Sequence, residues 1–184
     1  MIKDTFQKEG LHLSFEVFPP KKDADFDSAY DTLNALSTLQ PDFISVTYGA
    51  GGSKSKKTIE IASYIQNTLH IEALAHLTCV GSKKNDILSI VSQLQEHNIS
   101  QVLALRGDRP KDMSDEQYNS RDFAHASDLI AFLKTETALS CAGACYPEKH
   151  FECFSKETDL LHLKYKDPLQ NVVWCVLKSL HWFN

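Results

Sequence analysis

The sequence predicts an α/β fold of the (βα)8 TIM-barrel type, truncated to about five βα units. Strand-like segments recur at a nearly constant interval, helix patterns separate them, and their polar residues share one face. The segments begin near Leu13, Phe43, Glu72, Gln101 and Ser140, so the intervals are 30, 29, 29 and 39 residues. Strands and helices that alternate at this spacing form a parallel sheet with right-handed crossovers.

Amphipathic helix patterns fill the intervals between these strands. Apolar residues recur at helical spacing within 26–33, 61–65, 87–94 and 129–133. Such spacing places them on one side of a helix, where they can cover a sheet.

Side-chain alternation along the strands distinguishes a barrel from an open, doubly wound sheet. Both faces of an open parallel sheet are covered by helices, so its strands are apolar throughout. Here one set of alternating positions is apolar, while the other is polar toward the carboxyl ends. The apolar set is Phe15 and Val17, Ile44 and Val46, Ala75 and Leu77, and Leu103 and Leu105, and the polar set is Ser14 and Glu16, Ser45 and Thr47, His76 and Thr78, Arg106 and Tyr146. A barrel points its catalytic groups inward at these ends. The alternative is a five-stranded open nucleotide-binding module, and the order of the strands in the sheet distinguishes it from a barrel.

The chain is shorter than a whole barrel requires. Eight βα units take roughly 250 residues, whereas the sequence has 184. We therefore expect residues 1–166 to form a partial catalytic barrel. Residues 167–184 are expected to be a divergent tail, either a short helix or disordered, since their apolar positions suit one amphipathic helix.

Composition narrows the cellular setting and the partners. The net charge is −5 without a block of Lys and Arg, so neither nucleic acid nor an anionic membrane is expected as a partner. No apolar run reaches the ~18 residues that span a bilayer, and the N-terminus lacks a secretory apolar core. Five cysteines without framework spacing indicate reduced thiols and a cytoplasmic location.

Glu16 is the leading catalytic candidate, because it lies within the apolar run LSFEVFPP. Taking a carboxylate out of water costs several kcal/mol unless it is paired or protonated. We therefore expect a raised pKa that suits a general acid. An edge-strand glutamate that faces solvent is the alternative interpretation.

Two loops and a cysteine group are weaker candidates. The loop VTYGAGGS suits a phosphate or a planar cofactor, and LRGDRP is either a site loop or a solvated turn. Cys141, Cys145, His150 and Cys153 resemble a zinc knuckle. However, Cys141 and Cys145 would lie about 13 Å apart on one extended strand, too far for two zinc–sulfur bonds of ~2.3 Å. No metal site is predicted.

The segments FEVFPP, SVTYGAGG, AHLTC, ALRGD and YPE, in this order, resemble the methylenetetrahydrofolate reductase family over 13–166. The resemblance implies a barrel that binds FAD, which NADH or NADPH reduces. The substrate 5,10-methylenetetrahydrofolate then takes the hydride and becomes 5-methyltetrahydrofolate, a step of one-carbon metabolism and methionine biosynthesis. The family pattern assigns the general acid to Glu16 and places Asp108 near flavin and folate. It assigns cofactor binding to Thr47, Tyr48, Ala50, His76, Arg106, Gly107, Asp108, Ala126, Tyr146, His150, Asp159 and Lys166.

The sequence departs from the family pattern in two places, and the geometry of a partial barrel supports a second hypothesis. His162 and Tyr165 stand where bacterial members commonly carry asparagine and arginine, and residues 167–184 replace an expected sixth strand that contacts folate. The chain is then a non-catalytic truncated fragment that pairs with a full-length subunit, because a partial barrel leaves two exposed sheet edges. A homo-oligomer is compatible with either hypothesis.

Overall fold

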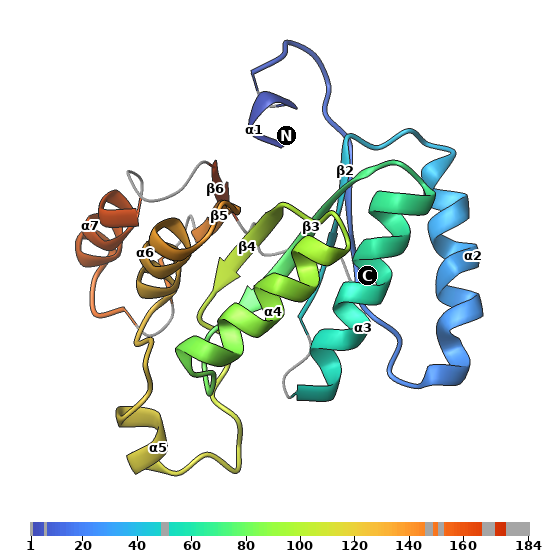
Figure 1. Cartoon of the computed structure of the whole chain (residues 1–184). Helices are drawn as coiled ribbons and strands as arrows, with labels where there is room; N and C mark the ends of the chain where they lie inside the picture. Colours follow the sequence, from blue (N-terminus) through green and yellow to red (C-terminus); the bar gives the residue numbers. More distant parts are fainter. Residues whose placement is uncertain are drawn as a thin grey trace, which may run out of the picture.

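One parallel six-stranded sheet forms the centre of the molecule (Figure 1). The structure is a computed structural model that describes residues 2–5, 7–48, 52–145, 149–150, 153–166 and 172–175. The strands are β1 (Ser14–Val17), β2 (Phe43–Val46), β3 (Glu72–Thr78), β4 (Gln101–Leu105), β5 (Ser140–Cys145) and β6 (Val172–Cys175). Each strand pairs with the next one along the chain. This order is that of a barrel, and it excludes the open doubly wound alternative.

Helices follow the strands and pack against one side of the sheet. They are α2 (Phe26–Ser37), α3 (Gly52–Ser63), which continues as the π-helical segment Tyr64–Thr68, α4 (Lys84–Glu96), α6 (Ala126–Glu136) and α7 (Lys156–Lys166). Three shorter helices, α1 (Ile2–Thr5), the 3-10 segment Asp23–Asp25 and α5 (Asp115–Asn119), lie outside this pattern. The predicted strand starts agree with the structure to within one residue.

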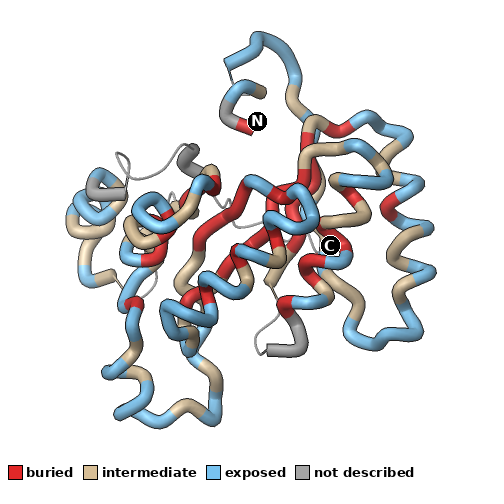
Figure 2. Tube along the Cα trace, viewed as in Figure 1, coloured by how far each residue is buried: buried red, intermediate tan, exposed pale blue. Residues whose placement is uncertain are grey.

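Two apolar clusters lie on opposite faces of the sheet. The outer cluster joins the helices to the strands through Ile44, Val46, Ala75, Leu77 and other buried side chains. The tube in Figure 2 shows this as buried segments along the strands and on the side of the helices that faces them. A smaller inner cluster consists of Ile2, Phe43, Leu74, Leu103 and Ala142.

The predicted alternation is wrong for β4. Leu103 belongs to the inner cluster and Leu105 packs against it, whereas Val102 and Ala104 belong to the outer cluster. Leu103 is the register partner of His76 on β3. Because β4 is apolar on both faces, its sequence carries no alternation signal, and only pairing with β3 sets which residues point inward.

The prediction of a helix or disorder in the tail is wrong for Val172–Cys175, which form β6 parallel to β5. The rest of 167–184 lies outside the described residues, and the division at residue 166 stays a prediction. Valine and tryptophan favour strands, and a strand edge presents unpaired N–H and C=O groups to a further strand. Pairing with the edge of β5 therefore favours a strand here, although the spacing of the apolar residues also suits a helix.

The short helix α1 covers the amino-terminal end of the inner face. The Ile2 N–H donates a 2.8 Å hydrogen bond to Gln101 Oε1, and Gln101, the first residue of β4, donates to Glu72, the first of β3. The carboxyl ends of the strands lie at the opposite end, toward α5 in Figure 1.

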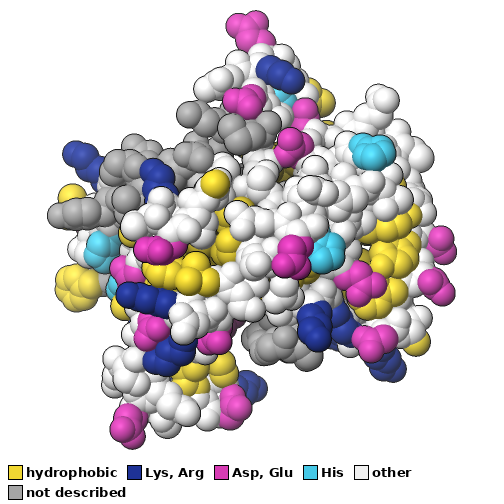
Figure 3. Space-filling view, in the orientation of Figure 1, with side chains coloured by type: hydrophobic (Ala, Val, Ile, Leu, Met, Phe, Trp, Pro, Cys, Tyr) yellow, Lys and Arg dark blue, Asp and Glu magenta, His cyan; other side chains and the backbone are white. Residues whose placement is uncertain are grey.

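The outer surface mixes charges of both signs. On the face that Figure 3 shows, acidic and basic side chains are interspersed over the helices. Within the ranges that the structure covers, no helix is long and apolar enough to cross a membrane.

Candidate functional site

Polar side chains of β1, β2 and β3 meet on the inner face of the sheet. Glu16 and Ser45 are register partners on β1 and β2. Glu16 Oε2 lies 3.4 Å from His76 Nε2 and accepts a hydrogen bond from Ser45 Oγ at 3.3 Å. The His76 side chain is 8% exposed, while that of Glu16 is 46% exposed. A buried base therefore contacts an acid that solvent or a ligand can reach.

The expected raised pKa of Glu16 is wrong for this arrangement. The interaction with the His76 side chain lowers the pKa of Glu16, and the Ser45 hydroxyl adds to this, while partial burial opposes it. A hydrogen-bond donor or a positive charge beside a carboxyl favours its charged form. Glu16 is thus a carboxylate near neutral pH.

The residues that follow β2 are held by hydrogen bonds from both sides. The Thr47 N–H donates to Val17 O at 3.0 Å, and Thr47 O accepts from Thr58 Oγ1 on α3 at 3.0 Å. The Tyr48 ring packs against the outer cluster. Burial raises the pKa of Tyr48, which a hydrogen bond with Ser55 partly offsets. The Tyr48 side chain therefore faces the helices rather than Glu16.

The turn after β4 requires glycine at position 107. Gly107 has a φ of +83°, and a Cβ there would lie 2.9 Å from Val80 Cγ1 and 3.0 Å from Thr78 Cβ. Residues other than glycine rarely adopt this backbone conformation. The absence of a side chain lets the turn lie directly against the end of β3.

The residues beyond β3 and β4 continue to pair after both strands end. The Cys79 N–H donates to Leu105 O at 3.1 Å, and the Val80 N–H donates to Arg106 O at 2.8 Å. Arg106 is half-buried and Asp108 is exposed. This pairing carries both side chains to the carboxyl edge of the sheet.

The start of α6 and the segment around α7 form a second polar group. The His150 N–H donates to Asp159 Oδ2 at 3.1 Å, and both residues are half-buried. Ala126 is the first residue of α6, directly after His125. The rings of His125 and His162 lie 6.5 Å apart, centroid to centroid. The beginning of α6 is therefore next to α7.

Comparison with known proteins decides the family. A family model for methylenetetrahydrofolate reductase matches residues 1–167. The chain belongs to this family.

Individual members of the methylenetetrahydrofolate reductase family agree with this assignment. The chain is 34% identical over 156 residues to the 5,10-methylenetetrahydrofolate reductase of Pectobacterium carotovorum subsp. carotovorum, covering 85% of this chain and 50% of that protein. The Escherichia coli (strain K12) enzyme of the same name is also 34% identical, with 85% and 51% covered. Methylenetetrahydrofolate reductase (NADH) 1 of Arabidopsis thaliana is 32% identical over 178 residues, with 90% and 30% covered. The chain spans about half the length of these bacterial relatives.

Solved structures show the same fold. Dihydrodipicolinate synthase from Agrobacterium tumefaciens str. C58 superposes with a TM-score of 0.57 at 16% identity, covering 92% of this chain and 55% of that one. A muconate cycloisomerase from Azorhizobium caulinodans gives 0.54 at 11% identity, covering 95% and 42%. The structural neighbours are TIM-barrel enzymes, and at these identities the likeness concerns the fold alone.

The residues that the family pattern assigns lie along the carboxyl edge of the sheet in three groups. From β1 onward, they are Glu16, Thr47, Tyr48 and His76; then Arg106, Gly107 and Asp108; then Ala126, His150 and Asp159. Ala50 and Tyr146 lie outside the described residues, and Lys166 ends α7 with its side chain also outside them. Sequence reasoning did not assign a role to Ser45, although its place in the inward polar set was the signal for its contact with Glu16.

Proposed function

We propose that this chain carries out the FAD-dependent reduction of 5,10-methylenetetrahydrofolate to 5-methyltetrahydrofolate, with NADH or NADPH as hydride donor. The observation that carries the proposal is the inward Glu16, in contact with His76 and Ser45 on the inner face of the barrel strands. Membership of the methylenetetrahydrofolate reductase family supports the same chemistry. The carboxyl edge of a barrel is where such enzymes place their catalytic groups.

The donor set along the edge fits FAD. The positive charge of Arg106 complements a pyrophosphate, and the half-buried Asp159 carboxylate suits the hydroxyl groups of a ribose. Gly107 keeps the turn after Arg106 close to the end of β3. When bound, FAD supplies a centre that accepts a hydride from the nicotinamide and passes it to the folate.

Glu16 is proposed as the general acid for the folate. Its proton moves to a folate nitrogen, and the electron pair of the carbon–nitrogen bond that breaks stays on that nitrogen. The methylene carbon becomes an electrophilic iminium that can take the hydride. Because contact with His76 lowers the pKa of Glu16, the carboxylate takes its proton from solvent water as a binding ligand displaces that water, since loss of water raises the pKa of a carboxyl. Ser45 and His76 keep the carboxyl oriented meanwhile.

Separate half-reactions of the purified chain test this proposal. We expect flavin absorbance that NADH or NADPH bleaches under argon and that methylenetetrahydrofolate restores. The Glu16→Gln variant should keep the bleaching step but lose at least about a hundredfold in the rate of restoration, since general acids contribute ~10²–10⁴-fold. Glu60→Gln is the matched control, because Glu60 bonds Tyr30 on the outer helices. A colourless chain that FAD cannot reconstitute, or a Glu16→Gln variant restored at the original rate, contradicts the proposal.

The open sheet favours a second candidate function, that of a partner for a full-length subunit. In the part of the chain that is described, β1 and β6 stand at the two ends of the strand order and do not pair with each other. Unpaired edges are ready to accept further strands. Light scattering tests this candidate: a hetero-assembly with a full-length relative supports it, and a well-behaved, active monomer rules it out.

A further inference from the structure

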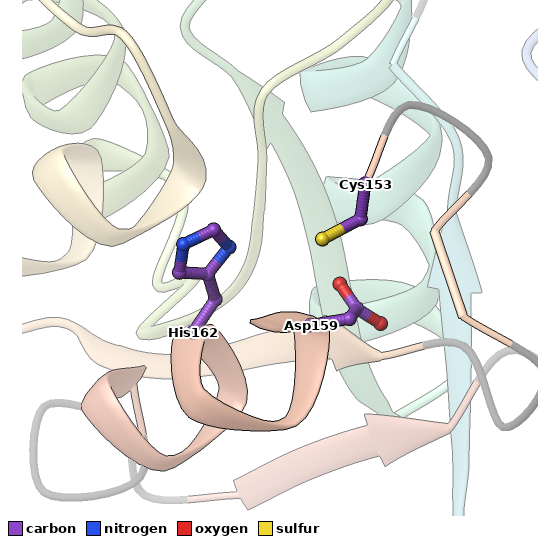
Figure 4. Close-up of side chains that lie close together, drawn as sticks. All are labelled: Cys153, Asp159 and His162. Atoms are coloured by element: carbon purple, nitrogen blue, oxygen red, sulfur yellow. The ribbon is translucent and has the colours of Figure 1, made fainter. Parts of the chain in front are cut away.

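We propose that Cys153, Asp159 and His162 form a binding site for a zinc ion at the beginning of α7. Each offers one ligand atom, a sulfur, a carboxylate oxygen and a ring nitrogen, and these three atoms lie within 4.8 Å of one another. Figure 4 shows the side chains converging on one point, two from the helix and Cys153 from the segment before it. The site lies outside the catalytic group around Glu16 and shares only Asp159 with the proposed flavin-binding residues.

Local structure brings the three ligands together. Asp159 and His162 are three residues apart on α7 and therefore share one face of the helix. The Thr158 N–H donates to Ser155 Oγ at 3.1 Å, which is the pattern of an N-cap. The cap lies two residues after Cys153 and α7 begins at the next residue, so the thiol stays beside the first turns.

Backbone contacts hold the cysteine and the carboxylate in place. The Cys153 N–H donates to His150 O at 3.0 Å, and Cys153 O accepts from Lys149 Nζ at 2.6 Å. The His150 N–H donates to Asp159 Oδ2 at 3.1 Å. Hydrogen bonds of this kind to a ligating group orient it toward a metal.

The spacing of the ligand atoms suits a tetrahedral ion after a small movement. Zinc bonds of about 2.3 Å to sulfur and about 2.0–2.1 Å to nitrogen or oxygen place neighbouring ligand atoms roughly 3.5 Å apart. The observed separations of up to 4.8 Å must therefore shrink by at most about 1.3 Å. His162 is exposed, so rotation of its side chain can supply this movement. A water molecule would complete the four ligands.

The ligand chemistry selects zinc among common divalent ions. A thiolate with an imidazole favours zinc, whereas magnesium and calcium prefer oxygen ligands. The thiolate and the carboxylate together balance the charge of the ion. Cys141 is buried in the outer cluster, away from this group, and the grouping of Cys141 with Cys145 plays no part in the proposal. The proposed site uses neither of them.

Cobalt and zinc titrations of the full chain test the site. We expect one cobalt ion per chain with the near-ultraviolet charge-transfer absorption of a cobalt–thiolate bond, and displacement of cobalt by one zinc ion. Cys153→Ser should abolish this absorption and weaken zinc binding at least tenfold, and His162→Gln should weaken it by a similar factor. Cys145→Ser is the matched control, because Cys145 is also half-buried, and it should bind zinc like the original chain.

A ligand exchange separates metal binding from folding. Cys153→His replaces one zinc ligand with another, so it should bind zinc without the charge-transfer absorption. A chain that binds no stoichiometric zinc, or a folded Cys153→Ser variant with unchanged affinity, overturns the proposal. Asp159 also belongs to the proposed flavin set, so zinc and flavin compete for this carboxylate, and each is measured without the other. Zinc is titrated into the flavin-free chain, and flavin binding is measured by its absorbance after a chelator has removed zinc. A flavin-free chain that binds no zinc would contradict this inference alone, and a zinc-free chain that binds no flavin would contradict the proposed function alone.

Discussion

Replacing Gly107 by alanine should destabilise the chain more than the same change at Gly81. Both glycines have a left-handed backbone, with φ of +83° and +76°. An alanine in this conformation costs roughly 1–2 kcal/mol at either position. The two positions therefore share the conformational cost and differ in what the new methyl group meets.

The neighbours of the added Cβ set the difference. At Gly107 it would lie 2.9 Å from Val80 Cγ1 and 3.0 Å from Thr78 Cβ, whereas at Gly81 it would lie 3.0 Å from Met113 Cε. The tip of a methionine can rotate away, but two β-branched side chains beside the backbone cannot. Forcing a methyl group into such a contact costs roughly 1–3 kcal/mol. Gly107→Ala should thus lose about 2–5 kcal/mol in total, and Gly81→Ala about 1–2 kcal/mol.

Urea unfolding of the full chain measures both losses. The free energy of unfolding is obtained from the transition midpoint and the slope for each variant and for the original chain. Equal losses at the two positions would refute the reasoning, because they would show that the contacts with Val80 and Thr78 add nothing. A smaller loss at Gly107 than at Gly81 would do so more strongly.

Three further predictions follow from the two faces of the sheet. His76→Gln should raise the pKa of Glu16 from its lowered position toward or above the usual 4.5, as followed by NMR of the carboxyl group. A lowered pKa stabilises the fold above pH 4.5, and this stabilisation is lost as the pH falls through the folded-state pKa, so the variant should also lose less stability on acidification. An unmoved pKa would contradict the assignment of the shift to His76. Leu103 is 2% exposed, so Leu103→Ala should lower the free energy of unfolding by about 2–5 kcal/mol. Leu160 is 54% exposed, so Leu160→Ala should change that free energy by no more than about 0.5 kcal/mol. Similar losses for the two variants in urea titrations would argue against the inner cluster. Burial raises the pKa of Cys141 to about 11, so its alkylation at neutral pH should be no faster than unfolding, and rapid labelling in peptide mapping would be inconsistent with its burial.

Much of the site's placement was predictable from parallel-strand geometry. Glu16 and His76 both occupy the polar alternation of their strands, and parallel pairing through β2 carries them to one face. Their contact at 3.4 Å is the result. The prediction succeeded here because β1 and β3 each have a polar residue that marks the inner face.

Other features had no such marker. Both faces of β4 are apolar, so the inward position of Leu103 depends on its pairing with His76. The residues Val172–Cys175 suit either a helix or a strand, and pairing with the edge of β5 selects the strand. A local sequence pattern cannot distinguish two conformations when only pairing with a neighbouring strand makes one of them more stable.

The sequence by itself determined the order of strands and helices and which polar residues stand at the carboxyl ends of the strands. These follow from periodicity over a few residues, which the chain carries locally. Only the tertiary structure decided that Glu16 has a lowered rather than a raised pKa, because His76 comes from another strand. The same holds for the approach of Cys153 to Asp159 and His162, since the cap at Ser155 and the bonds to His150 set where the thiol lies. The charge of Glu16 depends on a residue that is distant in sequence, which strand packing brings within 3.4 Å, whereas the ligand geometry depends on hydrogen bonds near α7 that a sequence pattern does not fix.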